Sequence, residues 1–306
     1  MNDAGERRRT DDGDDTITDD ETISGDDTGR YVYCVVPRDD DAAAAFDADG
    51  VAGADLAVVS TESLSAVVHD RAEPYESDAP GEVREWLYDH QAAVEAAGEA
   101  FGTPVPFRFD TVVRGDDETI RTWLSANADA LTEALADLSG RWEYRVEVEW
   151  DRDALAEALA DEDEELADLN ERLSDASDGT AFLLEKQYER RVSKLAAERR
   201  RRRTAELAAE LERTTDQAEE LGDAPQTPLT ESSSAPTARF AVLADEDERD
   251  AVGDFLDTIA DEDGASVQYT GPWPPYTFAP DACAPTGDDE SDEPPHATTP
   301  DSHDGA

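Results

Sequence analysis

Residues 142–150 constrain the fold most strongly, because apolar and charged side chains alternate along them without exception. The segment is WEYRVEVEW, in which Trp, Tyr, Val, Val and Trp share one face. A period of two is the side-chain spacing of a β-strand that has one buried face. We therefore predict a strand in a sheet covered on one side, whose wet side carries Glu143, Arg145, Glu147 and Glu149.

The rest of the middle of the chain alternates between short strand patterns and amphipathic helix patterns. Apolar runs predict strands at residues 30–36, 54–60, 64–70, 104–109, 239–244 and 266–269. Apolar residues at helical spacing predict helices at residues 80–101, 120–138, 153–173 and 245–259. This order, with its short hairpins, favours an α+β fold of two ferredoxin-like sheet-and-helix domains, at residues 30–140 and 141–280, over a doubly wound parallel sheet.

A long helical pattern distinguishes the second domain. One apolar stripe through Leu184 and Tyr188 and another through Leu207 and Leu211 predict a helical arm at residues 181–222. Five arginines at residues 199–203 separate the stripes, so we expect a helical hairpin or a short coiled coil interrupted at its middle. A linker rich in Pro, Ser and Thr follows at residues 223–237.

The arginine run admits three interpretations. It could neutralise nucleic-acid phosphates, receive an acidic partner, or pair with carboxylates of its own chain. Candidates for such pairing are Glu198 with Arg202, or the acidic residues 161–165. The nucleic-acid interpretation is the weaker one, because no aromatic residues interleave with the arginines and the remaining surface repels a polyanion.

The chain carries 78 acidic residues against 26 basic ones, which gives a formal net charge of −52. Self-repulsion of that size opposes compact folding in dilute buffer, but the Debye length shrinks to about 3 Å at 1 M salt. The composition therefore predicts a protein adapted to multimolar salt. The tails, residues 1–29 and 281–306, contain little to bury and are predicted to be disordered.

Sequence motifs of known catalytic chemistry are missing. The chain has no glycine-rich phosphate loop, no His pair of a zinc protease, no serine nucleophile elbow and no Cys/His metal cluster. We expect His69, at the end of a strand, and His90, in a helix, to be packed or half-exposed side chains without a chemical role. No apolar stretch is long enough to cross a bilayer, no secretory signal is visible, and two cysteines fit a reducing compartment. The prediction is an intracellular protein that is not an enzyme and has no cofactor or metal.

The segment GPWPPYTF, residues 271–278, is a candidate contact surface. Its prolines restrict the backbone, so little entropy remains to be lost on binding. Trp273, Tyr276 and Phe278 offer large amphipathic faces, which could equally pack over the core of the protein itself.

This closing motif resembles the hallmark of the gas vesicle protein GvpF/GvpL family. The segments RYVYCVV, AVVSTESLSAVVHD, HQAAVEAA followed by PVPFRFDTVV, WEYRVEVEW and GTAFLLEKQYERR resemble further parts of that family in order and spacing. The resemblance covers residues 30–278 and is somewhat closer to GvpL. Together with the acidic composition it suggests a haloarchaeal member.

The resemblance implies an accessory protein of gas vesicle assembly without catalytic residues. Its implied partners are the apolar shell protein and other accessory proteins, rather than nucleic acid or a membrane, and its implied location is the gas vesicle and the cytoplasm. The candidate contact residues are Trp273, Tyr276, Phe278, Tyr188, Leu184, Arg199 and Arg202. Two alternatives remain open. One is a small-molecule sensor, which needs a concave pocket with converging polar groups, and the other is a coiled-coil scaffold unrelated to vesicles.

Overall fold

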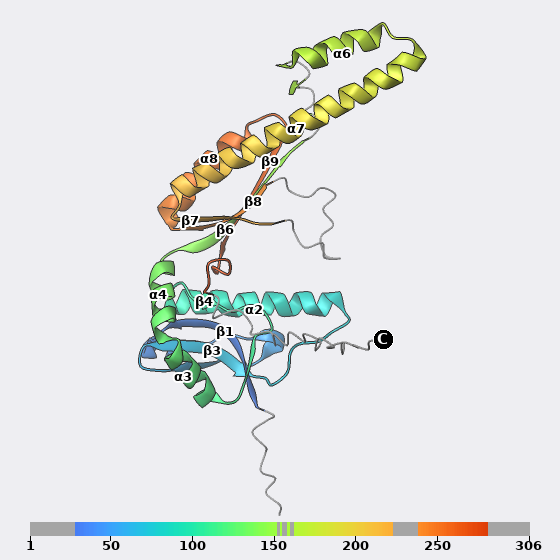
Figure 1. Cartoon of the computed structure of the whole chain (residues 1–306). Helices are drawn as coiled ribbons and strands as arrows, with labels where there is room; N and C mark the ends of the chain where they lie inside the picture. The colour runs from blue at the N-terminus through green and yellow to red at the C-terminus, as the bar shows by residue number, and fades with distance from the viewer. Residues whose placement is uncertain (1–27, 152–153, 155–157, 160–161, 223–237, 281–306) are drawn as a thin grey trace, which may run out of the picture.

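The computed structural model describes residues 28–151, 154, 158–159, 162–222 and 238–280, which build two sheet-and-helix units (Figure 1). Both sheets are antiparallel and carry helices, so the predicted α+β class is confirmed. Residues 1–27, the linker 223–237, the tail 281–306 and the predicted helix start at Asp153 lie outside the described residues. The boundary predicted between residues 140 and 141 stays a prediction.

The N-terminal sheet has the strand order β2-β3-β1-β4, and β5 also pairs with β1. Its strands are β1 (Gly29–Pro37), β2 (Ala57–Ser60), β3 (Leu64–Asp70), β4 (Val105–Pro106) and β5 (Val112–Arg114). The central strand β1 is buried from Tyr31 to Val36. A strand covered on both faces reads as a continuous apolar run, which explains the sequence RYVYCVV.

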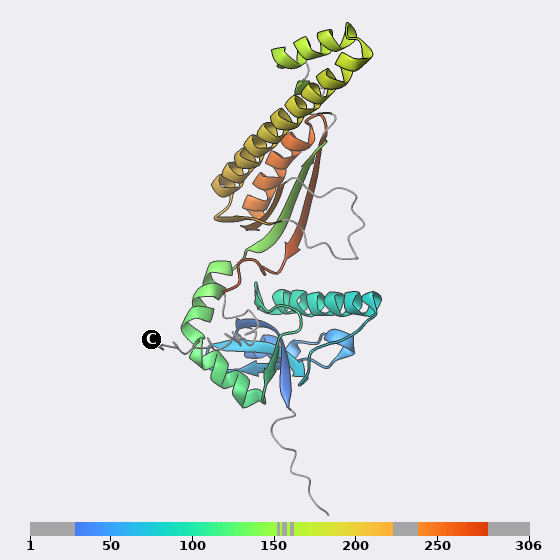
Figure 2. The ribbon, with the colours of Figure 1, turned by 45° about the vertical axis from the view of Figure 1, so that its right-hand side comes forward.

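Helices lie on both faces of this sheet (Figures 1 and 2). Helix α2 (Pro80–Phe101) packs through Ala93, Val94 and Ala97 on one face. Helices α3 (Asp117–Ala126) and α4 (Ala128–Leu138) cover the other face. The short helices α1 (Asp40–Ala45) and η1 (Val51–Gly53) lie between β1 and β2. The single helix predicted at 120–138 is wrong, because the chain breaks at Asn127, whose side-chain amide donates to the Trp123 carbonyl at 2.8 Å.

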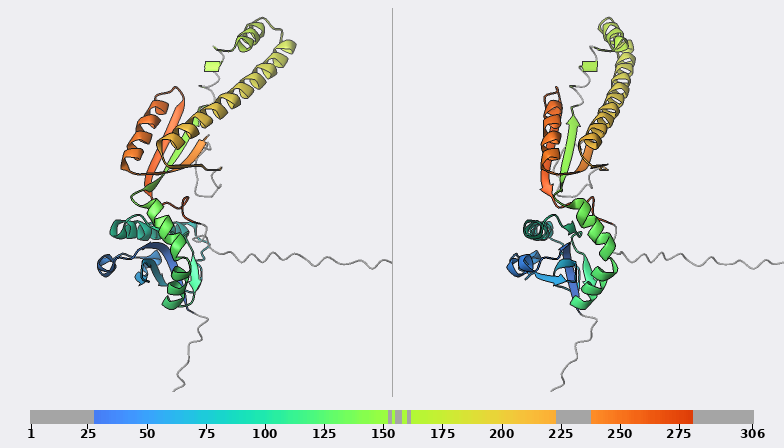
Figure 3. Two further views of the ribbon diagram at one scale, coloured as in Figure 1. Left: turned by 60° about the vertical axis from the view of Figure 1, so that its left-hand side comes forward. Right: turned by 90° about the vertical axis from the view of Figure 1, so that its left-hand side faces the viewer.

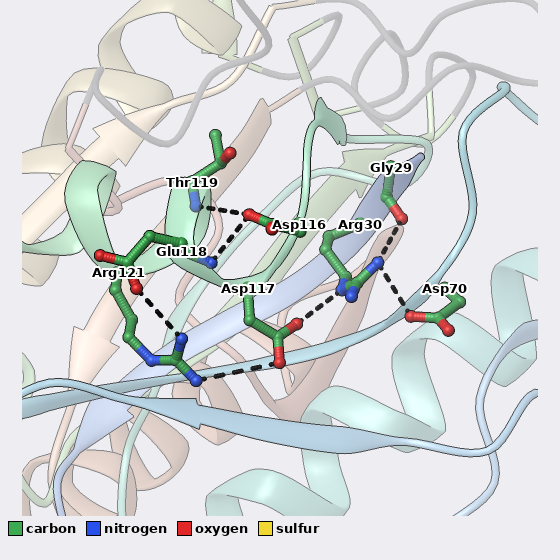
Figure 4. Close-up of polar contacts among 8 residues, drawn as sticks. All are labelled: Gly29, Arg30, Asp70, Asp116, Asp117, Glu118, Thr119 and Arg121. Carbon is green, nitrogen blue, oxygen red and sulfur yellow. Dashed lines mark hydrogen bonds and ion pairs between the residues drawn. The ribbon is translucent and has the colours of Figure 1, made fainter. Parts of the chain in front are cut away.

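One arginine ties three elements of this unit together (Figure 4). Arg30 of β1 pairs with Asp117 at the start of α3 (Nε–Oδ1 2.8 Å) and with Asp70 at the end of β3 (Nη1–Oδ1 3.0 Å). The Arg30 side chain is only 17% exposed, whereas Asp117 and Asp70 are 44% and 88% exposed, so salt screens the pair with Asp117 less than the pair with Asp70. Asp116 caps the same helix by accepting from the Glu118 and Thr119 amides.

Replacing Arg30 is expected to destabilise the N-terminal unit. Arg30→Gln removes two charge-assisted contacts, so the free energy of unfolding should fall by about 1–3 kcal/mol. Denaturant unfolding in high potassium chloride measures this loss. Arg114→Gln on neighbouring β5 is the matched control, because Arg114 is exposed and no ion pair is seen for it among the described residues. Equal losses in the two variants would contradict the assignment.

The C-terminal sheet has the strand order β7-β8-β6-β9. Its strands are β6 (Trp142–Trp150), β7 (Gln217–Glu220), β8 (Ala238–Ala244) and β9 (Ala265–Trp273). Helices α7 (Asp178–Thr214) and α8 (Glu246–Ala260) cover one face (Figure 2). In both units the two edge strands follow helical crossovers, which is the ferredoxin-like arrangement.

The arm consists of α6 (Glu164–Ser174) packed on the first half of α7, and it projects beyond the sheet (Figures 1 and 3). The predicted interruption at the arginine run is wrong, since α7 continues through it as one helix of 37 residues. The predicted helix end near Leu221 is also wrong. Residues 217–220 form β7, because pairing with β8 satisfies their backbone groups.

No helix among the described residues combines the length and the apolarity that crossing a bilayer requires.

Candidate functional site

The two units meet where the chain leaves β9. We call residues 271–280 the closing segment. Pro274 and Pro275 are buried, and Phe278 packs against the apolar core between the N-terminal sheet and α3 and α4. Leu243 of β8 belongs to the same core. The closing segment therefore also packs over the core, as the sequence allowed.

Two glycines let the backbones approach closely at this junction. Gly271 has φ +140°, and a Cβ there would lie 2.6 Å from Cδ1 of Tyr144. A Cβ on Gly98 of α2 would lie 2.5 Å from the Trp142 ring. A larger residue at Gly98 would press on Trp142 of the other unit, whereas one at Gly271 would press on Tyr144 of the neighbouring strand β6 within the C-terminal sheet.

Glu143 departs from its predicted place on the wet face of β6, since the residue is 0% exposed. The closing segment covers it. The Thr277 amide donates to Oε2 at 2.8 Å, and the Thr277 hydroxyl donates to Oε1 at 3.0 Å. Arg145 pairs with the same carboxylate. Burial raises the pKa of Glu143, although Arg145 and the Thr277 bonds work in the opposite direction.

A hollow of about 370 Å³, here called the junction hollow, opens beside this carboxylate. Its lining residues come from α2, β6, β9 and the closing segment, and they are Gln91, Glu143, Arg145, Glu147, Gln268, Thr270, Trp273 and Tyr276. The Tyr276 hydroxyl is buried and meets no hydrogen-bond partner among the described residues. Burial also raises its pKa. The junction hollow supplies the concave polar lining that the small-molecule alternative requires.

A second polar cluster lies inside the N-terminal unit, where two tyrosines of β1 meet two histidines. The Tyr31 hydroxyl accepts from the Asp110 amide at 3.0 Å and lies 2.8 Å from Nδ1 of His90. Nε2 of His90 then donates to the Phe107 carbonyl at 3.0 Å. Because the Phe107 carbonyl can only accept, Nε2 carries the proton of the neutral ring, and Nδ1 of that ring accepts from the Tyr31 hydroxyl.

The other histidine is held in the same way. The Tyr33 hydroxyl accepts from the Val51 amide at 2.7 Å and donates to Nδ1 of His69 at 2.8 Å, while Nε2 of His69 faces the Tyr75 hydroxyl at 3.3 Å. Burial is the main cause that lowers the pKa of both histidines to about 4. Both imidazoles are closed in by protein partners, which confirms the packing role predicted for His69 and His90.

The arginine run mostly pairs with the chain's own carboxylates. Arg199 pairs with Glu162 at 2.9 Å and thereby ties α7 to the acidic residues before α6. The predicted pair of Glu198 and Arg202 is wrong, since the Arg202 guanidinium lies 3.7 Å from Glu206 and the Glu198 carboxylate 4.0 Å from Lys194. Both alternative pairs also have i,i+4 spacing, so spacing alone could not choose between them.

The arm carries apolar residues that the sequence interpretation missed. Phe182 and Leu183 on the arm are 60% and 61% exposed, whereas the predicted residues Leu184 and Tyr188 are buried or packed against the core of the arm. Outside the arm, Trp273 of the closing segment is 38% exposed and Tyr88 of α2 is 66% exposed. The exposure of Phe182 and Leu183 could have been predicted from the helical spacing, because they precede Leu184 and lie beside the buried stripe rather than on it. The predicted role in protein contact stays a prediction for all seven candidate residues.

Comparisons with known proteins place this architecture in a family. The family described as gas vesicle synthesis protein GvpL/GvpF matches residues 29–280. Gas vesicle protein L1 of Halobacterium salinarum is 42% identical over 272 residues, covering 87% of this chain and 94% of that protein. Gas vesicle protein L of Haloferax mediterranei is 41% identical over 231 residues, covering 73% and 70%.

A solved structure shares the fold. The crystal structure of GvpF from Anabaena sp. superposes with a TM-score of 0.59 at 19% identity, covering 83% of this chain and 96% of that chain. The relatives at about 40% identity are L proteins of halophilic archaea, which agrees with the predicted salt adaptation and with the closer resemblance to GvpL. The chain therefore belongs to the gas vesicle synthesis protein GvpL/GvpF family, and its role is that of a gas vesicle accessory protein.

Proposed function

We propose that this protein binds the apolar shell protein of the gas vesicle in the cytoplasm, keeps it dispersed and delivers it to the growing vesicle together with other accessory proteins. One observation carries the proposal. The chain has a net charge of −52, yet its closing segment contains no charged residue and leaves Trp273 38% exposed. The rest of the surface supplies solubility, and this segment supplies an apolar contact.

The physical reason for such a protein is aggregation. An apolar shell subunit exposes patches that associate in water, and salting-out ions strengthen that association. A strongly charged carrier counteracts it, because net charge far from zero keeps a protein soluble. The exposed Phe182 and Leu183 offer a second apolar contact on the arm, away from the junction.

Replacing the aromatic residues of the closing segment tests the proposal. Trp273→Ala combined with Tyr276→Ala should weaken co-purification of the shell protein by at least about tenfold, since a buried aromatic anchor contributes about 2 kcal/mol or more. Cells that carry this double variant as their sole copy should lose buoyancy and light scattering.

Two further variants separate binding from folding. Trp273→Ala alone spares the half-buried Tyr276, and Tyr88→Ala removes an aromatic residue of α2 that is more exposed than Trp273, at 66% against 38%. The first should reproduce most of the loss and the second should bind like the wild type. Undiminished binding and normal vesicles in both Trp273 variants would refute the proposal.

A further inference from the structure

The free edge of β9 is unlike the other sheet edges among the described residues. Strand β9 pairs with β6 on one side and has nine residues. The other outer strands are short, with four residues in β2, two in β4, three in β5 and four in β7, of which β7 also carries two glutamates. Proteins normally shield a long edge with charges, prolines or a covering element, because its unpaired backbone groups recruit other strands.

The sequence provides no such shield along β9. Residues 264–280 contain no Asp, Glu, Lys or Arg, although 34% of the chain is charged. Ser266, Gln268 and Thr270 are exposed on the face of the sheet that α7 and α8 leave open. Pro272 lacks a backbone N–H, so it ends the usable edge, which runs from Ala265 to Gly271.

The junction hollow lies beside this edge. Gln268 and Thr270 of β9 line it together with Trp273 and Tyr276. A strand added to β9 would continue the open face of the sheet, because side chains alternate between the two faces. Alternate side chains of the added strand would then lie beside the hollow, where the Tyr276 hydroxyl has no partner among the described residues.

We propose that β9 is a strand-addition site, and that an extended, uncharged and apolar segment of the shell protein pairs with its free edge and places a side chain at the junction hollow. Main-chain hydrogen bonds along β9 supply affinity, and the hollow selects the side chain. This inference rests on the proposed function. Charge argues for an uncharged occupant: the net charge of −52 repels an acidic strand, and β9 itself has no carboxylate that would pair with a basic one. A second copy is disfavoured as the occupant, because two chains that each carry a net charge of −52 repel one another.

Charge on the open face tests the site. Thr270→Lys adds a charge that an apolar strand would have to bury or displace, so binding of the shell protein should weaken by about tenfold or more. Thr258→Lys makes the same substitution at an exposed position of α8, away from the edge, and should leave binding unchanged. Both variants are measured by co-purification with co-expressed shell protein in high potassium chloride.

Hydrogen–deuterium exchange of the full chain gives an independent readout. Among the described residues no strand pairs with the outer edge of β9. We expect the amides that point to this edge to exchange quickly in the isolated protein and to gain protection with the shell protein present. If the wild type does not bind the shell protein, the proposed function fails. If it binds while β9 gains no protection and Thr270→Lys matches Thr258→Lys, the strand-addition site fails and the function stands. A dimer with β9 protected before any shell protein is added would also overturn the inference, since the occupant would be a second copy.

Discussion

Between pH 6.5 and pH 4 the N-terminal unit is expected to lose stability, because its two buried histidines cannot take up protons while it is folded. Burial lowers the pKa of His69 and of His90 from 6.5 to about 4. The unfolded chain therefore binds more protons across this window. The stabilisation from the neutral imidazoles is complete above pH 6.5, and it is lost progressively as the pH falls toward 4.

The expected effect is large. Each histidine changes the free energy of unfolding by about 1.4 kcal/mol per pH unit inside the window, which amounts to about 3 kcal/mol over its full width. The two losses together are comparable to the free energy of unfolding of an ordinary domain, which is about 5–15 kcal/mol. Protonation would also end donation from the Tyr31 hydroxyl to Nδ1, because a charged imidazole has no acceptor nitrogen and Nδ1 could then only donate to that hydroxyl.

His90→Gln isolates this contribution from the protonation of the many carboxylates. The glutamine amide has an acceptor for Tyr31 and a donor for the Phe107 carbonyl, but it does not titrate. Denaturant unfolding at a series of pH values, at constant high salt, should give a pH dependence about 1.4 kcal/mol per unit flatter for the variant. Parallel curves for the variant and the wild type would contradict the assignment.

Glu143→Ala is expected to destabilise the junction by about 2–4 kcal/mol. The carboxylate accepts from both the amide and the hydroxyl of Thr277 and faces Arg145, so its removal leaves part-buried donors without their acceptor. The side chain of Arg145 is 33% exposed, and water can reach it, which keeps the loss below that of a fully buried pair. The closing segment should loosen, and its amides should exchange faster.

Glu149→Ala is the matched control, since Glu149 lies on the same strand and the same face but is only half-buried. Its loss should stay within about 0.5 kcal/mol, as for ordinary surface substitutions. Unfolding in denaturant gives both free energies, and hydrogen–deuterium exchange at residues 274–278 reports the closing segment. If Glu149→Ala costs as much as Glu143→Ala, then Glu143 has no special part in holding the junction.

Local periodicity predicted most strands and helices, because the two spacings report which side chains are buried. It failed where distant residues decided the outcome. Ala218 and Leu221 continue the helical spacing of α7, yet the edge of β8 captured residues 217–220 as a strand. The apolar stripe through Leu124 and Leu131 crosses the break at Asn127, because α3 and α4 pack on the same face of one sheet.

The candidate site was predictable only in part. Prolines and aromatic residues mark the closing segment, and they led to Trp273 and Tyr276 directly. The sequence pattern predicted a solvent-exposed Glu143, because alternation shows which residues share a face of the sheet but not whether another segment covers that face. Its cover, Thr277, comes from the far end of the chain. The junction hollow depends likewise on Gln91 of α2, which no spacing connects to β6.

The packing of Phe278 and Leu243 into the first apolar core has a consequence for biosynthesis. The ribosome releases the strands and helices of that core long before it releases the residues that seal it. The nascent N-terminal unit therefore exposes part of its apolar core to water. This surface is covered only after residues 243 and 278 have been synthesised. A chain that ends upstream of Phe278 would leave the apolar surface that this side chain covers exposed to water.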